Sequence, residues 1–123
     1  MKVKHHHYTE QFNNAPILLQ IIAYDFRTRS LEFGIEPVIT RITDTVEGES
    51  GVHPQERGLD FRDFHMNGCL YTEEQSQSIV HYINGKYQRI DDYLVCIHHG
   101  DPKHFHLQIP LQTIALRGPL WRE

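Results

Sequence analysis

Several histidine and acidic residues are spaced as the donors of a metal site would be. His53 and Asp60 are separated by six residues, and His104 and His106 lie two apart in a segment that alternates polar and apolar residues. Residues two apart in a β-strand project from the same face, so both imidazoles are predicted to point the same way. A pair at this spacing also arises by chance among ten histidines, in which case it would lie at a solvent-exposed sheet rim.

The donor types are those of a catalytic zinc ion. Zinc in such sites takes three protein ligands, commonly imidazole and carboxylate, and leaves a fourth position for water. His53, Asp60 and one histidine of the strand pair would supply three. The metal lowers the pKa of its bound water to about 7, which makes hydroxide available at neutral pH. His104 and Asp101 are candidates for the base that takes the proton, and Arg41 is the candidate that holds the oxyanion.

Two helices and four strands are predicted to position these residues. The apolar and turn patterns predict helices over 15–29 and 73–87 and strands over 38–42, 58–62, 93–97 and 104–109. Asn14 and Thr72 are the predicted N-caps. The helices are expected to bury one face each, with the core-facing residues Ile17, Leu18, Ile21, Ile22, Ile79, Tyr82 and Ile83. Segment 93–97 is predicted as an interior strand that pairs with 104–109 in an antiparallel hairpin.

The fold class predicted from these elements is α+β, with two helices over a small, mainly antiparallel sheet. The 123 residues form one domain, in which 1–12 is a tail or an edge strand and 111–123 is a C-terminal extension. The polar segment 43–57 is a long loop, and loops of that length in compact domains often carry function. Of His98 and His99, one is expected to face the site and the other to point away.

Charge and composition exclude some classes of function. Lys and Arg number 12 against 16 Asp and Glu, a net charge of −4, which argues against a nucleic-acid partner. The longest apolar run, 15–24, is too short to span a membrane, and no signal-peptide pattern is present. Two cysteines cannot form a disulfide framework. We therefore expect synthesis in the cytoplasm; the oligomeric state is not readable from the sequence.

The motifs resemble those of the M15 zinc peptidases, the group of D-Ala-D-Ala carboxypeptidases and L-alanyl-D-glutamate endopeptidases. These share their metal-site layout with lysostaphin-type enzymes and the hedgehog signalling domain. The resemblance is carried by GVH…RGLDFR, CIHHG…HFHLQIP and VITR, and covers roughly 35–110 in matching order. The segments are most similar to small phage or prophage members of the group.

The resemblance implies a fold of the hedgehog/D-Ala-D-Ala-peptidase type and one zinc ion per chain, held by His53, Asp60 and His106. It leaves two registers open at the last motif. Members with H-x-H bind metal through the second histidine, whereas members with D/E-x-x-H would pair Asp101 with a metal-binding His104. The presence of a second histidine favours His106.

The function that this implies is hydrolysis of peptidoglycan stem peptides by a metal-activated water, in a protein that acts at the cell wall after release or as part of a phage particle. One alternative is a catalytically silent zinc-binding module, such as a component of a phage particle. Another is a cysteine–histidine hydrolase using Cys96, although its apolar neighbours suggest a buried core thiol. The bond that is cleaved depends on the shape of the pocket, which the sequence leaves open.

Overall fold

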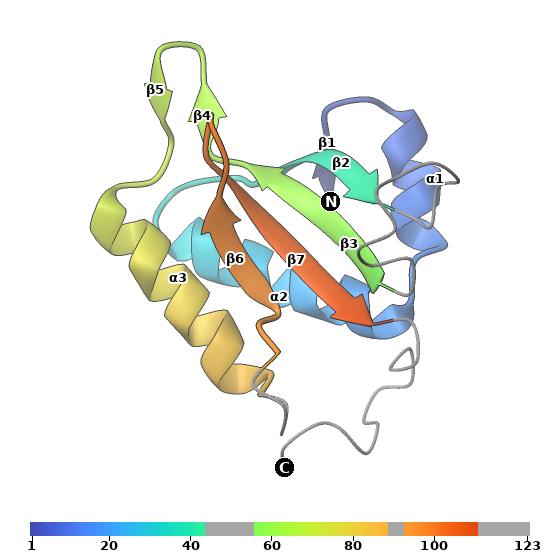
Figure 1. The fold of residues 1–123 in the computed structure, drawn as a ribbon. Coiled ribbons are helices and arrows are strands. Elements are labelled where there is room, and N and C mark those ends of the chain that lie inside the picture. Colours follow the sequence, from blue (N-terminus) through green and yellow to red (C-terminus); the bar gives the residue numbers. More distant parts are fainter. Residues whose placement is uncertain (44–55, 89–92, 111–123) are drawn as a thin grey trace.

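A computed structural model of the chain describes residues 1–43, 56–88 and 93–110 (Figure 1). The helices are α1 (His7–Asn13), α2 (Ile17–Glu32) and α3 (Glu73–Lys86). A five-stranded sheet contains β1 (Lys2–Val3), β2 (Val38–Thr43), β3 (Glu56–Arg62), β6 (Cys96–His99) and β7 (His104–Pro110). A separate small hairpin is formed by β4 (Phe64–His65) and β5 (Gly68–Cys69). Within the described ranges, no helix combines the length and apolar character needed to cross a membrane.

The sheet is mainly antiparallel, which confirms the predicted α+β class. Its strand order is β1-β2-β3-β7-β6, and β1 is the one strand of the described sheet that pairs in parallel, with β2. The hairpin of β6 and β7 is confirmed. The prediction of an interior strand over 93–97 is wrong in two respects, because β6 begins at Cys96 and lies at the edge of the sheet.

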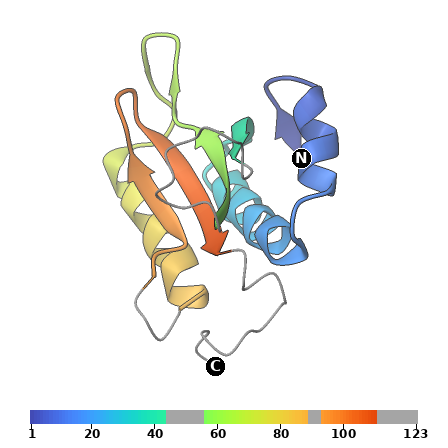
Figure 2. The same ribbon diagram turned by 45° about the vertical axis from the view of Figure 1, so that its right-hand side comes forward.

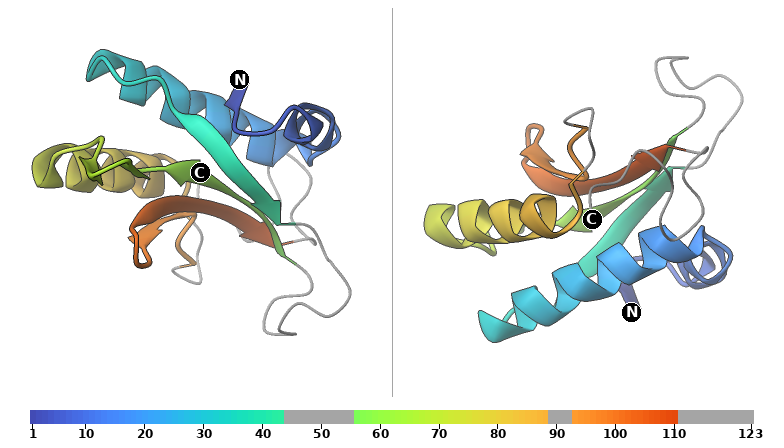
Figure 3. Two further views of the ribbon diagram at one scale, coloured as in Figure 1. Left: turned by 90° about the horizontal axis from the view of Figure 1, so that it is seen from above. Right: turned by 90° about the horizontal axis from the view of Figure 1, so that it is seen from below.

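Helices α2 and α3 cover the same face of the sheet (Figure 3). Their buried residues pack on the inward side chains of β3 and β7, where Phe26 stacks on Phe61 and contacts Phe105 edge-on. The expected helix faces need correction at two positions: Ile17 is 68% exposed and Tyr82 is 38% exposed. The buried stripe of α2 is instead Leu18, Leu19, Ile22, Ala23, Phe26 and Ser30, the period expected of a helix packed along one side.

The two predicted helix starts have different outcomes. Thr72 accepts a hydrogen bond from the Gln75 backbone N–H, and the Gln75 side chain accepts one from the Thr72 backbone N–H, so the predicted cap of α3 is a full capping box. Asn14 is not the N-cap of α2. That helix begins after Pro16, whose side chain makes no capping bond.

The N-terminal segment is ordered by the rest of the fold. Strand β1 extends the sheet at its edge, which confirms the prediction of an edge strand for this segment. The residues that follow it form α1, a helix that the sequence did not predict. Phe12 of α1 is 2% exposed and belongs to the core. The C-terminal extension 111–123 and most of the long loop, 44–55, lie outside the described residues.

Candidate metal centre

The outer face of the sheet, opposite the helices, carries the candidate site. In the register of β3 with β7, Asp60 lies directly opposite His106, and Arg62 lies opposite His104. Their neighbours Leu59, Phe61, Phe105 and Leu107 are fully buried on the inner face. The alternation of strand side chains therefore places two histidines, a carboxylate and a guanidinium together on one face, as their spacing predicts.

Asp60 and His106 are in direct contact. The Asp60 Oδ1 atom lies 2.7 Å from His106 Nδ1, and the Asp60 residue is 9% exposed. The second carboxylate oxygen, Oδ2, lies 3.8 Å from His104 Nε2, which is beyond hydrogen-bonding distance. One oxygen of this carboxylate is thus engaged by an imidazole, and the other faces a second imidazole across a gap.

The orientation of His104 is set by the turn between β6 and β7. Its Nδ1 lies 3.3 Å from the Pro102 carbonyl oxygen, which can only accept, so the Nδ1–H donates this hydrogen bond and Nε2 is turned toward Asp60. Gly100 makes room for this ring: it has a φ of +98°, and a Cβ there would lie 2.6 Å from His104 Cε1. The glycine is required both by the backbone conformation and by the close approach of the imidazole.

A β-bulge brings Arg41 to the same face. Ile39 pairs with Phe61 on the inner face, yet Arg41, two residues later, pairs with Asp60 on the outer face. The extra residue, Thr40, reverses the alternation, so the strand buries Ile39 and still presents Arg41 beside Asp60. The Arg41 residue is exposed, and it lines a pocket together with Asp60 and His104.

This pocket has a volume of about 380 Å³ and opens beside the Asp60 carboxylate. The β4–β5 hairpin and the β6–β7 turn lie side by side at this end of the sheet (Figures 1 and 2). Both contribute to the pocket, which is lined by Lys4, Thr40, Arg41, Asp60, Arg62, Asp63, Phe64, His65, Met66, Pro102, Lys103 and His104.

The two consecutive histidines His98 and His99 project to opposite faces. The His99 ring lies with its centroid 4.8 Å from that of His104 and 5.9 Å from that of His106. Burial lowers the pKa of His99, and the neighbouring imidazoles His104 and His106 add to that effect. A neutral His99 beside the pair can accept or donate a proton, as expected for the residue of the two that faces the site.

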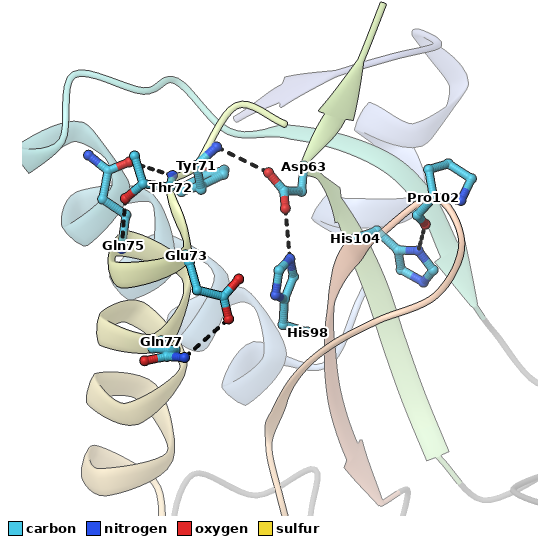
Figure 4. Close-up of polar contacts among 9 residues, drawn as sticks. All are labelled: Asp63, Tyr71, Thr72, Glu73, Gln75, Gln77, His98, Pro102 and His104. Atoms are coloured by element: carbon cyan, nitrogen blue, oxygen red, sulfur yellow. Dashed lines mark hydrogen bonds and ion pairs between the residues drawn. The ribbon is translucent and has the colours of Figure 1, made fainter. Parts of the chain in front are cut away.

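His98 belongs to a second aspartate–histidine pair, on the inner face, which the sequence did not predict. Its Nε2 lies 2.7 Å from Asp63 Oδ2, and its ring stacks on Phe105. The other oxygen, Oδ1, accepts a hydrogen bond of 3.1 Å from the Tyr71 backbone N–H (Figure 4). The Asp63 residue is 1% exposed, and its backbone oxygen also accepts from Leu70 N–H, which closes the base of the β4–β5 hairpin.

The other residues predicted for the site lie away from the Asp60–His106 contact or outside the described residues. Asp101 lies exposed in the β6–β7 turn. His53 lies outside the described residues, so the first predicted ligand has no described position. Cys96 is fully buried, and burial raises the pKa of its thiol well above the ordinary value. A thiol kept protonated and away from solvent is a poor nucleophile, which argues against the cysteine hydrolase.

The donor set fits zinc as far as it is described. Zinc binds carboxylate oxygen and imidazole nitrogen at about 2.0–2.2 Å, and Asp60 and His106 present one of each, in contact. Over the described ranges, no group of three or more His, Cys, Asp or Glu side chains is arranged to hold a metal ion. A complete ligand set therefore needs a residue such as His53 from outside those ranges.

Comparisons of the chain with protein-family models, with curated proteins and with solved structures return no match. The arrangement of the residues themselves must therefore carry the functional interpretation.

Proposed function

We propose that this chain is a zinc-dependent peptidase that hydrolyses the stem peptides of bacterial peptidoglycan. The observation that supports the proposal most is the Asp60–His106 contact across β3 and β7, in which Asp60 also lines a pocket together with Arg41 and His104. The M15-like motifs on the same residues supply the substrate class. The site of action is the cell wall, which the protein reaches after release or as part of a phage particle.

In this proposal Asp60, His106 and His53 hold one zinc ion per chain. When bound, zinc polarises a carbonyl group and lowers the pKa of water to about 7. His104 Nε2 lies 3.8 Å from Asp60 Oδ2, so the imidazole is placed beside the proposed zinc ligands, where it would take a proton and return it to the leaving amine. Arg41, on the same face, would stabilise negative charge on the substrate carbonyl oxygen.

Asp101 remains the second candidate for the base. Its exposed position in the turn is three residues before His104, so it could act on a substrate held at the rim of the pocket. The alternative register, in which His104 is the ligand and Asp101 its acidic neighbour, uses the same residues with exchanged roles. In both registers a single zinc site borders the pocket.

The deciding measurement is the zinc content of the purified, tag-free chain by elemental analysis. We expect about one zinc per chain in the parent, little in Asp60→Ala and His106→Ala, and an unchanged content in the matched control His81→Ala, whose exposed histidine lies on α3 and does not line the pocket. Zinc that stays after loss of Asp60, or that is absent from the parent, would contradict the proposal.

The second candidate function is a zinc-binding module without turnover, as the resemblance to the hedgehog domain suggests. A double variant, His104→Ala with Asp101→Ala, separates the two. If the parent releases fragments from purified muropeptides and the folded, zinc-loaded double variant does not, the chain is an enzyme. If the zinc-loaded parent leaves a broad muropeptide mixture intact, the silent module is favoured.

A further inference from the structure

Asp63 is a buried carboxylate that joins three segments of the chain. It follows the last residue of β3, and its side chain is 1% exposed. Its Oδ1 accepts the hydrogen bond from the Tyr71 backbone N–H, and its Oδ2 lies 2.7 Å from His98 Nε2 on β6 (Figure 4). Its backbone oxygen accepts a bond of 2.7 Å from Leu70 N–H. Because water has almost no access to this carboxylate, its protein partners must stay in place to satisfy it.

The contact between Asp63 and His98 ties the edge strand β6 to the end of β3. In the order β3-β7-β6, strand β7 lies between these two, so the contact crosses β7. It does so at Phe105, on which the His98 ring stacks with the centroids 4.3 Å apart. The start of β6 is held by the Asn84 side chain of α3, which bonds both the N–H and the C=O of Cys96. Strand β6 is thus fixed at its start by α3 and at its end by Asp63.

The end of β6 also carries a residue that faces the candidate metal centre. His99 follows His98 directly and projects to the opposite face, so a displacement of this strand end moves both side chains. The centroid of the His99 ring lies 4.8 Å from that of His104, its partner in the register of β6 with β7. The turn between them holds the His104 Nδ1–H on the Pro102 carbonyl oxygen. The position of the β6 end therefore determines where this turn starts and how the His104 ring is held.

The Asp60–His106 contact is made without strand β6. It joins β3 to β7, and these two strands pair with each other over seven residues. A displaced β6 should therefore leave the two proposed zinc ligands together while it moves His99 and His104. This difference separates an effect on the imidazoles beside the metal from an effect on the metal ligands themselves.

We propose that Asp63 and His98 are positioning residues for the outer face of the sheet. Their buried contact holds the end of β6, and through it His99 and the turn that orients His104, beside the Asp60–His106 pair. The geometric part of this inference concerns the folded chain alone. Its consequence for turnover rests on the proposed peptidase function, in which His104 transfers the proton.

The geometric test measures nuclear Overhauser effects between the ring protons of His99 and His104 in the full chain with EDTA. These effects are detected only between protons that lie close together, so they report the spacing of the two rings directly. We expect them in the parent and expect them to be lost in two variants, Asp63→Ala and His98→Phe. The second variant removes the contact with Asp63 but keeps an aromatic ring on Phe105, and it decides the question if Asp63→Ala does not fold.

Two further variants separate positioning from a general loss of stability. Asp63→Asn is the conservative variant, because its amide oxygen can accept from Tyr71 N–H and its amide nitrogen can donate to His98 Nε2. Leu19→Ala is the matched control: it lowers stability by leaving a cavity at a core residue of α2 that is 1% exposed. Both variants should keep the Overhauser effects between the two rings.

The kinetic test uses the zinc-loaded chain at a temperature at which every variant is folded. His98→Phe should keep about the zinc content of the parent, because Asp60 and His106 remain paired. Its kcat on muropeptides should fall about ten- to a hundredfold with little change in KM, as expected for a misplaced proton-transfer group. Asp63→Asn should recover most of this loss, and Leu19→Ala should match the parent.

Three results would overturn the positioning role. These are Overhauser effects that survive in folded His98→Phe, their disappearance in Leu19→Ala as well, and a kcat of zinc-loaded His98→Phe equal to that of the parent. Failure of the proposed function is read from a different measurement. A parent chain that binds no zinc has no peptidase site of the proposed kind, whereas the spacing of the rings is measured in EDTA and tests the role of Asp63 and His98 by itself.

Discussion

The molecule contains two aspartate–histidine pairs with the same 2.7 Å contact, one on each face of the sheet. Asp63 and His98, on the inner face, are closed off: both carboxylate oxygens have donors, and the Asp63 side chain is 1% exposed. In the outer-face pair of Asp60 and His106, the Asp60 Oδ2 atom has no hydrogen-bond donor among the described residues and lies 3.8 Å from His104 Nε2, in a pocket that Asp60 and His104 both line. Both aspartates pair with a histidine, so the pairing does not distinguish the two sites. The difference is that Asp60 keeps one oxygen, Oδ2, that can still bind a ligand, whereas both oxygens of Asp63 are engaged.

The largest difference between the pairs should appear in stability. In the presence of EDTA, Asp63→Ala is expected to lower the free energy of unfolding by about 3–5 kcal/mol, because it leaves His98 and the Tyr71 N–H buried without their acceptor. In a domain of this size that is a fall in Tm of roughly 10–20 °C. Asp60→Ala should cost only about 1 kcal/mol, since solvent from the pocket replaces the lost contact.

Zinc should reverse the order of the two variants, so that Asp60→Ala shows the larger loss of stability relative to the parent. Adding zinc is expected to raise the Tm of the parent, because an ion that binds only the folded chain stabilises it, and to leave Asp60→Ala unchanged. Thermal melts of the parent and both variants, with and without zinc, make the comparison. Equal losses for the two variants in EDTA would show that the pairs are alike and would remove the physical distinction drawn above.

The outer pair could be predicted from sequence because it depends on strand periodicity. His104 and His106 share a face by their spacing, and Asp60 joins them once β3 and β7 pair in register. The Thr72 cap and the β6–β7 hairpin are likewise local features, and both were predicted correctly. A prediction succeeds where a few neighbouring residues determine the geometry.

The inner pair and the contribution of Lys4 to the pocket beside Asp60 could not be predicted because they depend on distant segments. Asp63 and His98 are 35 residues apart, and although His98 belongs to the segment CIHHG, no spacing in the sequence links it to Asp63. Lys4 reaches the pocket only because β1 adds to the edge of the sheet beside β2, and a two-residue strand leaves almost no periodic signal. Helix α1 was missed for the same reason, since Phe12 is its one buried residue.

The region around the inner pair should also respond to alkaline pH. Burial raises the pKa of the Tyr71 phenol to about 12, compared with about 10 when the chain is unfolded. Below pH 10 both states hold the proton; above it the unfolded chain releases the proton first, so stability falls as the pH rises toward 12. Between pH 9 and 11.5 the parent should lose about 2 kcal/mol more than Tyr71→Phe.

Urea titrations of both proteins at four or five pH values measure this difference. Tyr71→Phe also loses the hydrogen bond to Ser30, so it starts from a lower stability at pH 9, and the slope with pH is therefore the quantity to compare. Parallel curves would mean that the phenol titrates alike in the folded and unfolded chain, which its burial should prevent.

A smaller effect is expected from the turn that orients His104 on the outer face. Gly100→Ala should cost about 1–2 kcal/mol for a left-handed backbone conformation and also displace the His104 ring, which the new methyl group would meet. Gly34→Ala is the matched control: its φ is +78°, and nothing lies within 4 Å of an added Cβ. Both should lower the Tm, but only Gly100→Ala should shift the His104 ring signals in NMR and reduce peptide hydrolysis. Unchanged His104 signals in Gly100→Ala would argue that the turn does not hold the ring.

The smallest effect is expected from alkylation of the cysteines, which tests whether the chemistry occurs at the inner or the outer face of the sheet. Cys96 is fully buried in the core, on the inner face of β6, with a raised thiol pKa, whereas Cys69 is exposed in β5. Iodoacetamide should therefore modify one site on the folded chain, Cys69, and leave zinc content and hydrolysis nearly unchanged. Mass spectrometry of a tryptic digest identifies the modified residue, and a Cys69→Ser variant is the control that should take up no label until it is unfolded. Rapid labelling of Cys96 together with loss of hydrolysis would reinstate the cysteine hydrolase, and the outer face would then no longer be the place where the chemistry occurs.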